Sequence, residues 1–353
     1  MEQEPTIDAL LARHRVPGAA WAIVDTDTWT TGTAGIDPAT RRPVTRDTQF
    51  QIGSLSKSFC ALVACLLVDD GTVPWNDDLA SWAADTNGLL QRNGHDGAVT
   101  VARLLSHTAG VGVHGFVGYA PDEPIPTQRE VVLGRFEDAS GSVNSGAVTM
   151  EIDAGVEFRY SGGGYQLLEL ALEEVTGDDF AALVDRLVLW PASMSATGFA
   201  EPPDPSAGSF DGEVLAEHHR RYPERAAAGL WSTVDDLARW HVELLAARRD
   251  PDHHWHRAVT LMATPANVPA STDDEAPQPG GHGLRLDSLT TPRWAAHRGR
   301  TLGFAATNAL GLGGRHAAIA LTNGFPGGSE VGDELIVHAA TAHGWHGWRP
   351  MHW

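Results

Sequence analysis

The chain has 353 residues, of which 42% are hydrophobic and 20% are charged, with 45 acidic against 25 basic side chains. A hydrophobic fraction of this size excludes general disorder and predicts a folded globular protein. The formal net charge of -20 repels phosphate backbones and anionic membrane surfaces, so we expect neither nucleic acid nor a membrane as a partner.

The amino-terminal segment lacks the features of a targeting sequence. Residues 1–15 (MEQEPTIDALLARHR) have no basic start and no apolar run of signal-peptide length. No later stretch reaches the length of a membrane-spanning helix. We therefore expect a cytoplasmic protein.

The first 35 residues predict one helix and two strands. Residues 5–14 (PTIDALLARH) read as a helix, and the VPG that follows is a turn signal. The segments AAWAIVD and TWTTGTAG then predict two strands joined by an Asp-rich turn. An antiparallel sheet begins here.

A buried helix follows these strands. Apolar residues recur at helical spacing until DDG, where Gly71 is placed to end the helix. These apolar residues are Phe59, Leu62, Val63, Leu66 and Leu67. Cys60 and Cys65 lie five residues apart within the same pattern, where a disulfide is geometrically poor, so we expect two core thiols.

The rest of the chain returns from helices to strands. Helical patterns at 99–106, 166–176, 178–189 and 234–248 are separated by long loops, and period-two segments (WAAH, FAATNAL and RHAAIALTN) precede a final helix at about 330–343. We predict an α+β sandwich in which helices flank an antiparallel sheet built from both chain ends. Residues 1–58 and 286–353 would form the sheet domain, residues 59–285 a mostly helical domain, and the active site would lie between them.

A Ser-x-x-Lys pattern opens the predicted helix. Ser54 and Lys57, the sole lysine of the chain, lie three residues apart, so a helical turn brings the Lys57 amine to the Ser54 hydroxyl. A serine hydroxyl needs a proton acceptor to become a nucleophile, and a buried lysine can supply one. The spacing alone also occurs by chance, so the surrounding sequence decides its meaning.

Several segments, in order along the chain, resemble the motifs of class C β-lactamases, DD-peptidases and related esterases. The nucleophile segment of that family is similar to FQIGSLSKSF at 50–59. Further matches are VPGAAWAIVD (16–25), LLSHTAG (104–110), FRYSGGGYQLLE (158–169), AAAGLWSTVDDLARW (226–240), and HRGRTLGF (297–304) with LTNG (321–324). The resemblance spans about residues 10–345 and implies a β-lactamase/transpeptidase-like fold.

The resemblance also implies roles for particular residues. Tyr160 would lie opposite Ser54, share the proton with Lys57 and protonate the leaving group. Lys57 and Tyr160 would titrate as a coupled pair, and either could be the base. Tyr165 is the rival tyrosine, but it lies in the helical pattern with Leu168 and Leu172 and is expected in the core.

The segment His297-Arg298-Gly299 corresponds to the family's third motif. The resemblance implies that this segment lines the site, that Gly299 leaves room for substrate, and that the backbone N–H groups of Ser54 and Arg300 form the oxyanion hole. Histidine in place of the family's usual lysine weakens the fixed positive charge at this position, and we expect Arg298 or Arg300 to compensate.

The chain departs from the family at the tyrosine motif, which is commonly Tyr-x-Asn. Here Ser161 and Gly162 follow Tyr160, so the substrate-binding amide is missing, and these two residues are assigned to substrate binding in its place. His107, in LLSHTAG, is expected to cap or pack rather than join a Ser-His-Asp triad, because the chain lacks a G-x-S-x-G elbow.

These observations predict a serine hydrolase that acts on small carboxylic esters or amides through an acyl-enzyme. The alternatives are a β-lactamase or D-amino-acid/DD-peptidase, an acyltransferase to a non-water acceptor, and a sensor that is acylated without turnover. We expect no metal and no cofactor, although the tract DHHWH at 252–256 could in principle bind a metal. Loops at 111–150, 200–225 and 265–290 are expected to form the pocket walls.

Overall fold

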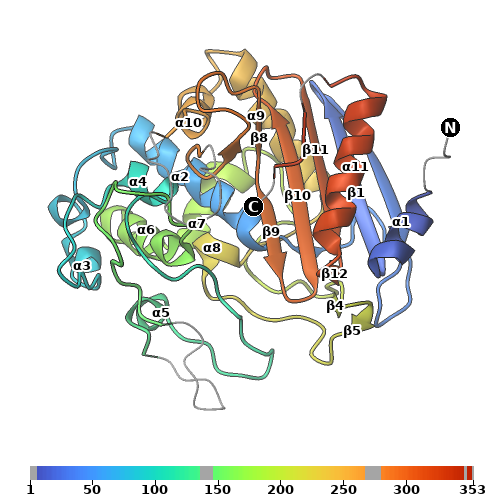
Figure 1. Ribbon diagram of the computed structural model, residues 1–353, viewed down its shortest axis with the longest axis horizontal. Helices are drawn as coiled ribbons and strands as arrows, with labels where there is room; N and C mark the ends of the chain where they lie inside the picture. The colour runs from blue at the N-terminus through green and yellow to red at the C-terminus, as the bar shows by residue number, and fades with distance from the viewer. Residues whose placement is uncertain (1–5, 136–145, 267–279, 346–347, 352–353) are drawn as a thin grey trace.

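The computed structural model describes residues 6–135, 146–266, 280–345 and 348–351. Figure 1 shows a sheet covered by helices, with a largely helical region to one side. The longer helices are α1 (Ile7–His14), α2 (Ser56–Asp69), α6 (Gly162–Thr176), α9 (Val234–Arg249), α10 (His256–Met262) and α11 (Gly328–Ala342). The shorter helices are α3 (Ala84–Asn87), α4 (Val101–Leu105), α5 (Gln128–Leu133), α7 (Phe180–Val184) and α8 (Arg225–Ala228).

The main sheet is antiparallel and joins the two ends of the chain. Its strands run in the order β2 (Thr28–Gly35), β1 (Gly18–Asp25), β11 (His316–Thr322), β10 (Phe304–Gly311), β8 (Trp294–Ala296) and β7 (Arg285–Leu286), and β9 (Arg298–Thr301) also pairs with β10. Short strands outside it are β3 (Phe50–Gln51), β4 (Ser209–Phe210), β5 (Glu213–Val214), β6 (Trp231–Ser232) and β12 (Gly324–Phe325). The first strand pairs with the last long one, from Ala19 opposite Thr322 to Asp25 opposite His316.

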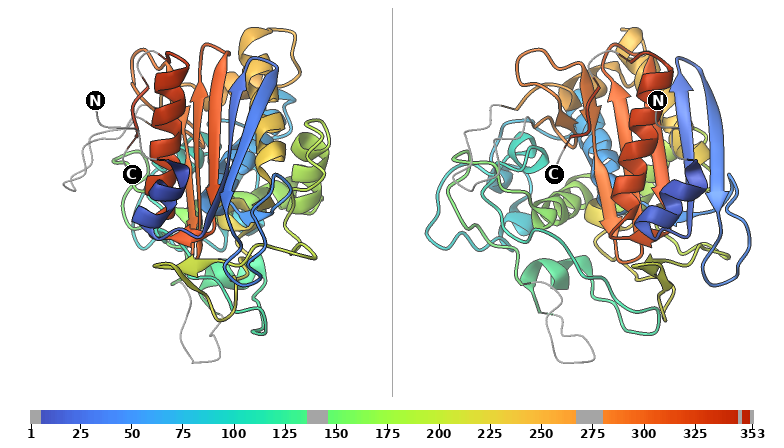
Figure 2. Two further views of the ribbon diagram at one scale, coloured as in Figure 1. Left: turned by 90° about the vertical axis from the view of Figure 1, so that its right-hand side faces the viewer. Right: turned by 45° about the vertical axis from the view of Figure 1, so that its right-hand side comes forward.

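Helices cover both faces of this sheet. Figure 2 shows α11 on one face and α9 on the other. Successive residues of β11 alternate accordingly, because Ala317 and Ile319 belong to the main core whereas Ala318 packs in the cluster around Ile336 of α11. Because helices bury both faces, the residues of β11 between His316 and Thr322 are all apolar instead of alternating with polar residues.

The first predicted elements are confirmed to within one or two residues by α1, β1, β2 and α2. The expected free thiols are also confirmed, because Cys60 and Cys65 are both unpaired and buried. In the described residues, no helix is long and apolar enough to cross a membrane. The helix α9 lies within the predicted helical domain, residues 59–285, yet it packs against the sheet. The division of the chain into two domains therefore stays a prediction.

Candidate active site

Ser54 lies on a tight turn immediately before α2. Residues Gly53–Leu55 form a single 3-10 turn, and Gly53 has a positive φ of 51°. A Cβ atom at Gly53 would lie 2.7 Å from the backbone nitrogen of Arg300 on β9. The missing side chain therefore lets the Ser54 turn pack directly against the backbone of Arg300.

Lys57 occupies the next turn and contacts Ser54 as the spacing predicted. Its Nζ donates to Ser54 Oγ at 3.0 Å and to the backbone oxygen of Ala227, in α8, at 2.8 Å. The lysine is only 1% exposed. Its amine is thus held by two acceptors and directed at the serine hydroxyl.

The two candidate tyrosines lie in different environments. The ring of Tyr160 is centred 5.1 Å from Lys57 Nζ and lines the cavity that contains Ser54. Tyr165 is fully buried, donates its hydroxyl proton to Leu105 O at 3.0 Å, and has a pKa raised well above its usual value by burial. Of the two tyrosines, Tyr160 is therefore the one that shares a cavity with Ser54 and Lys57.

A cavity of about 350 Å³ opens above these residues. It is lined by Ser54, Lys57, His114, Gly115, Phe116, Phe158, Tyr160, Tyr222, Ala227, Ala228, Arg285, Arg298 and Arg300. The lining residues 114–116, 222 and 285 fall in the three loop ranges that the sequence predicted as pocket walls. In the part of the chain that the structure describes, no cluster of three or more His, Cys, Asp or Glu residues is placed to hold a metal ion.

Gly299 is essential to the local packing. A Cβ atom there would lie 1.7 Å from the backbone oxygen of Ile52 and 2.9 Å from the backbone nitrogen of Leu55. This glycine therefore allows a close approach between β9 and the serine turn, and its role toward a substrate stays a prediction. The glycine positions the backbone of Arg300 beside Ser54.

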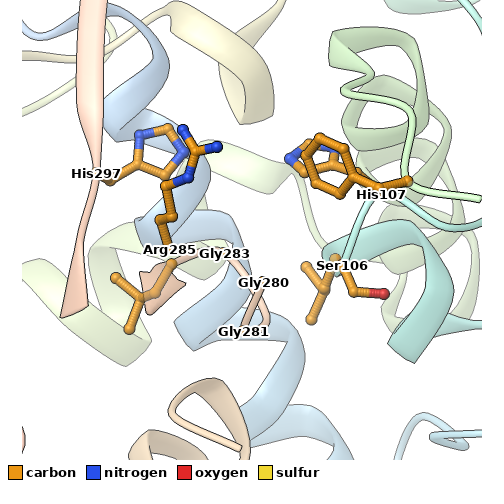
Figure 3. A pocket seen from close by; sticks show the side chains of 10 residues that line it. Ser106, His107, Gly280, Gly281, Gly283, Arg285 and His297 are labelled. Carbon is orange, nitrogen blue, oxygen red and sulfur yellow. The ribbon is translucent and has the colours of Figure 1, made fainter. Parts of the chain in front are cut away.

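His297 does not supply a positive charge. It is 2% exposed, and burial, reinforced by the charge of Lys57, lowers its pKa to about 3. Its Nδ1 lies 2.7 Å from Arg298 O, so the neutral ring donates to that carbonyl. It lines a second, much smaller cavity, where Figure 3 shows it facing His107 with Arg285 beside it. A neutral imidazole agrees with the weakening of the family's fixed positive charge that a histidine at this position predicts, because burial disfavours the charged ring.

Ser161 and Gly162 each have a structural contact beside the tyrosine, and their assignment to substrate binding stays a prediction. The Ser161 hydroxyl donates to Gly112 O at 2.6 Å and accepts the Gly164 N–H at 2.8 Å, and so caps α6. A Cβ atom at Gly162 would lie 2.8 Å from the ring of Phe116. The aromatic ring thus occupies the space beside Gly162, where the family's usual asparagine would begin.

Buried carboxyl groups surround α8, the helix that holds Lys57 through Ala227 O. Glu169 of α6 accepts from the Arg225 guanidinium at 2.8 Å and from the Ala226 N–H at 2.9 Å. Glu224 precedes α8, is fully buried, and has no hydrogen-bond partner for either carboxyl oxygen among the described residues. Burial raises the pKa of Glu224 to about 8, so its neutral form is the stable one in the fold.

The Glu224→Gln variant is expected to flatten the pH dependence of stability. Between pH 4.5 and about 8 the folded chain keeps a proton on Glu224 that the unfolded chain releases, so stability falls as the pH rises through that window. Glutamine stays neutral, so the variant should gain about 4 kcal/mol over the wild type at pH 8.5 relative to pH 5, since each pH unit of the window contributes about 1.4 kcal/mol. Urea unfolding at both pH values measures the difference. Parallel losses of stability in the two proteins would contradict the assignment.

Sequence reasoning missed several residues of this site. His114, Phe116, Phe158 and Tyr222 reach the cavity from loops, and no local pattern distinguishes them from other loop residues. Ala227 contributes only a backbone oxygen, which no sequence motif reports. For Phe158 and Ala227, which lie within segments that resemble family motifs, that resemblance was the available signal of a place near the site.

Comparison with known proteins assigns this chain to a family. The model of the Beta-lactamase family matches residues 4–342. Penicillin-binding protein 4 of Amycolatopsis lactamdurans is 33% identical over 51% of this chain and 44% of its own length, and esterase EstB of Burkholderia gladioli is 27% identical over 60% and 59%. These matches span roughly half the length of each relative.

A solved structure supports the same fold. The octameric penicillin-binding protein homologue from Pyrococcus abyssi superposes with a TM-score of 0.75 at 22% identity, over 96% of this chain and 76% of that one. The agreement confirms the predicted mixed α+β architecture with an antiparallel sheet. Because the family model matches nearly the whole sequence, this chain belongs to the Beta-lactamase family.

Proposed function

We propose that the protein is a serine hydrolase that cleaves small carboxylic esters or amides through an acyl-enzyme on Ser54. The observation that carries this proposal is the 3.0 Å contact between Lys57 Nζ and Ser54 Oγ in a cavity that Tyr160 also lines. A nucleophile, a proton acceptor within hydrogen-bond distance and room for a small molecule are the elements that acyl transfer requires.

The proposed reaction has two steps. Ser54 Oγ attacks the substrate carbonyl while its proton passes to the Lys57–Tyr160 pair, and the bond to the leaving group breaks as that group receives the proton. Water then attacks the acyl-enzyme and gives a proton to the same pair. The bond between the acyl carbon and Ser54 Oγ breaks, the pair returns that proton to Ser54 Oγ, and the carboxylic acid is released. Contact between the Ser54 turn and the Arg300 backbone supports their N–H groups as donors to the oxyanion.

Three features support esters or small amides over β-lactams and peptides. The Tyr-x-Asn amide is absent, the Phe116 ring lies beside Gly162, and His297 is neutral. One relative with a comparable match is named an esterase. A penicillin-binding protein is also among the relatives, so the test must compare the substrate classes directly.

Three arginines add positive charge to the cavity. Arg285, Arg298 and Arg300 all line it, and Arg298 forms an ion pair with Asp333 of α11. An acidic group on the substrate would be attracted by this charge. The substrate screen should therefore include neutral esters together with their acidic counterparts.

One screen tests the proposal. Nitrophenyl acetate, butyrate and hemiglutarate, D-amino-acid amides and a chromogenic cephalosporin are each incubated with the wild type and with Ser54→Ala. We expect the wild type to turn over at least one ester or amide and Ser54→Ala to turn over none. We expect the wild type to hydrolyse the cephalosporin more slowly than that ester or amide. Rapid cephalosporin turnover with inert esters would instead identify a β-lactamase, and a stable adduct without turnover would identify a sensor.

A further inference from the structure

His107 accepts hydrogen bonds from the residues on both sides of Tyr160. Its backbone oxygen accepts the N–H of Arg159 at 2.8 Å, and its ring Nδ1 accepts the N–H of Ser161 at 3.1 Å. One residue therefore binds the two amide groups that flank the tyrosine. This double contact fixes the direction in which the backbone presents the Tyr160 side chain.

The imidazole ring also packs on the phenol ring itself. The ring centroids of His107 and Tyr160 are 4.4 Å apart with an interplanar angle of 33°, and Tyr165 packs on the same imidazole at 5.3 Å. The backbone of His107 has a positive φ of 59°, a conformation that is uncommon for a residue other than glycine. A strained backbone at this position is what presents both the carbonyl and the ring to the tyrosine segment.

The contact with Ser161 requires a neutral ring. Nδ1 can accept the Ser161 N–H only when the ring proton is on Nε2. Burial lowers the pKa of His107 well below its usual value, and the positive charges of Lys57 and Arg285 act in the same direction. The ring thus stays an acceptor over the range in which an esterase is assayed.

We propose that His107 is a positioning residue that fixes the hydroxyl of Tyr160 relative to Ser54 and Lys57, through its two hydrogen bonds to the flanking peptide and its ring contact. This inference rests on the proposed function, because it assigns His107 to proton transfer by Tyr160. His107 does not touch the reacting atoms. Misplacing a proton-transfer group by about 1 Å can cost on the order of 10²-fold in rate, so its loss should appear in kcat.

Two variants of similar shape separate the hydrogen bond from packing. In His107→Asn the amide oxygen can replace Nδ1 as acceptor, and asparagine tolerates a positive φ. In His107→Leu the side chain has nearly the same shape as asparagine but cannot accept. We expect the leucine variant to lose on the order of 10- to 100-fold in kcat, with KM within about threefold, and the asparagine variant to retain most of kcat.

The control is His282→Asn. His282 is also buried, but its ring packs on Trp75 and its Nδ1 contacts Leu261 O, so its replacement tests the general effect of removing a buried imidazole. We expect this variant to keep the wild-type kcat. If the leucine variant does not fold, His107→Gln replaces it, because the longer side chain places its oxygen beyond the position of Nδ1.

A spectroscopic measurement makes the test independent of turnover. The chain has four tyrosines, so ring-labelled tyrosine gives few resonances, and Tyr160→Phe identifies the one from Tyr160. We expect its chemical shift and titration midpoint to change in His107→Leu and to return toward wild type in His107→Asn. An unchanged Tyr160 resonance with kcat within threefold of wild type, or equal losses in the asparagine and leucine variants, would overturn the inference. A wild type that turns over no substrate would refute the proposed function but would leave this spectroscopic result to decide the role of His107.

Discussion

Lys57→Met is expected to lower kcat/KM by on the order of 10²- to 10⁴-fold, the typical contribution of a positioned proton-transfer group. The side chain is 1% exposed, and its Nζ bonds Ser54 Oγ and Ala227 O. Methionine fills a similar volume without an amine, so packing is retained while Ser54 loses its proton partner. Steady-state kinetics on the best ester of the screen, with thermal unfolding of both proteins, measures the effect.

The sole lysine also allows the charge of the site to be measured directly. In a lysine-labelled spectrum the side-chain resonance can come only from Lys57, so its titration needs no assignment. A midpoint near the usual value of about 10.4 would identify Lys57 as a charged partner of Tyr160, and a much lower midpoint would identify it as the base. Retention of wild-type kcat/KM in a folded Lys57→Met variant would contradict the assignment to either role.

Tyr160→Phe is expected to lower kcat by on the order of 10²- to 10⁴-fold with a smaller effect on KM. The phenylalanine keeps the ring that packs on His107 but removes the hydroxyl proposed to protonate the leaving group. The matched control is Tyr165→Phe, which removes a hydroxyl that donates to Leu105 O in the core. We expect that control to lose about 1 kcal/mol of stability while its activity stays near wild type.

The double variant tests whether the two groups act together. Lys57 and Tyr160 lie within 5.1 Å, from Nζ to the ring centre, and share one proposed proton. Losses from such a unit do not add, so Lys57→Met with Tyr160→Phe should be little slower than the worse single variant. Fully multiplicative losses would show that the two side chains act independently, contrary to the account.

Local sequence patterns predicted those helices and strands that have a regular spacing of apolar residues or a short motif. The alternation in β1 and β2, the apolar spacing in α2 and the Ser-x-x-Lys turn each depend on neighbours in sequence, and the structure confirms their positions. The strand β9 (Arg298–Thr301) has no apolar alternation, so only its resemblance to a family motif indicated it. The four-residue helix α8 is too short for a periodic signal.

The remaining features depend on tertiary packing, which a single sequence does not encode in any local pattern. The neutrality of His297 follows from its burial against distant segments. The need for Gly299 comes from the Ile52 carbonyl, almost 250 positions away in the chain. The acceptor role of Ala227 belongs to a backbone oxygen that any residue would have. The sequence therefore predicts candidate reactive groups, whereas the contacts that hold them become visible only in the structure.

The most direct test of the central claim is the location of the covalent adduct. The wild type and Ser54→Ala are treated with a fluorophosphonate probe, and the intact mass and fragmented peptides are measured. We predict one adduct per chain, located on Ser54 and not on the neighbouring Ser56 or Ser58, and none in the variant. An adduct that persists in Ser54→Ala, or an unmodified Ser54 in a wild type that hydrolyses the ester, would contradict the assignment of Ser54 as nucleophile.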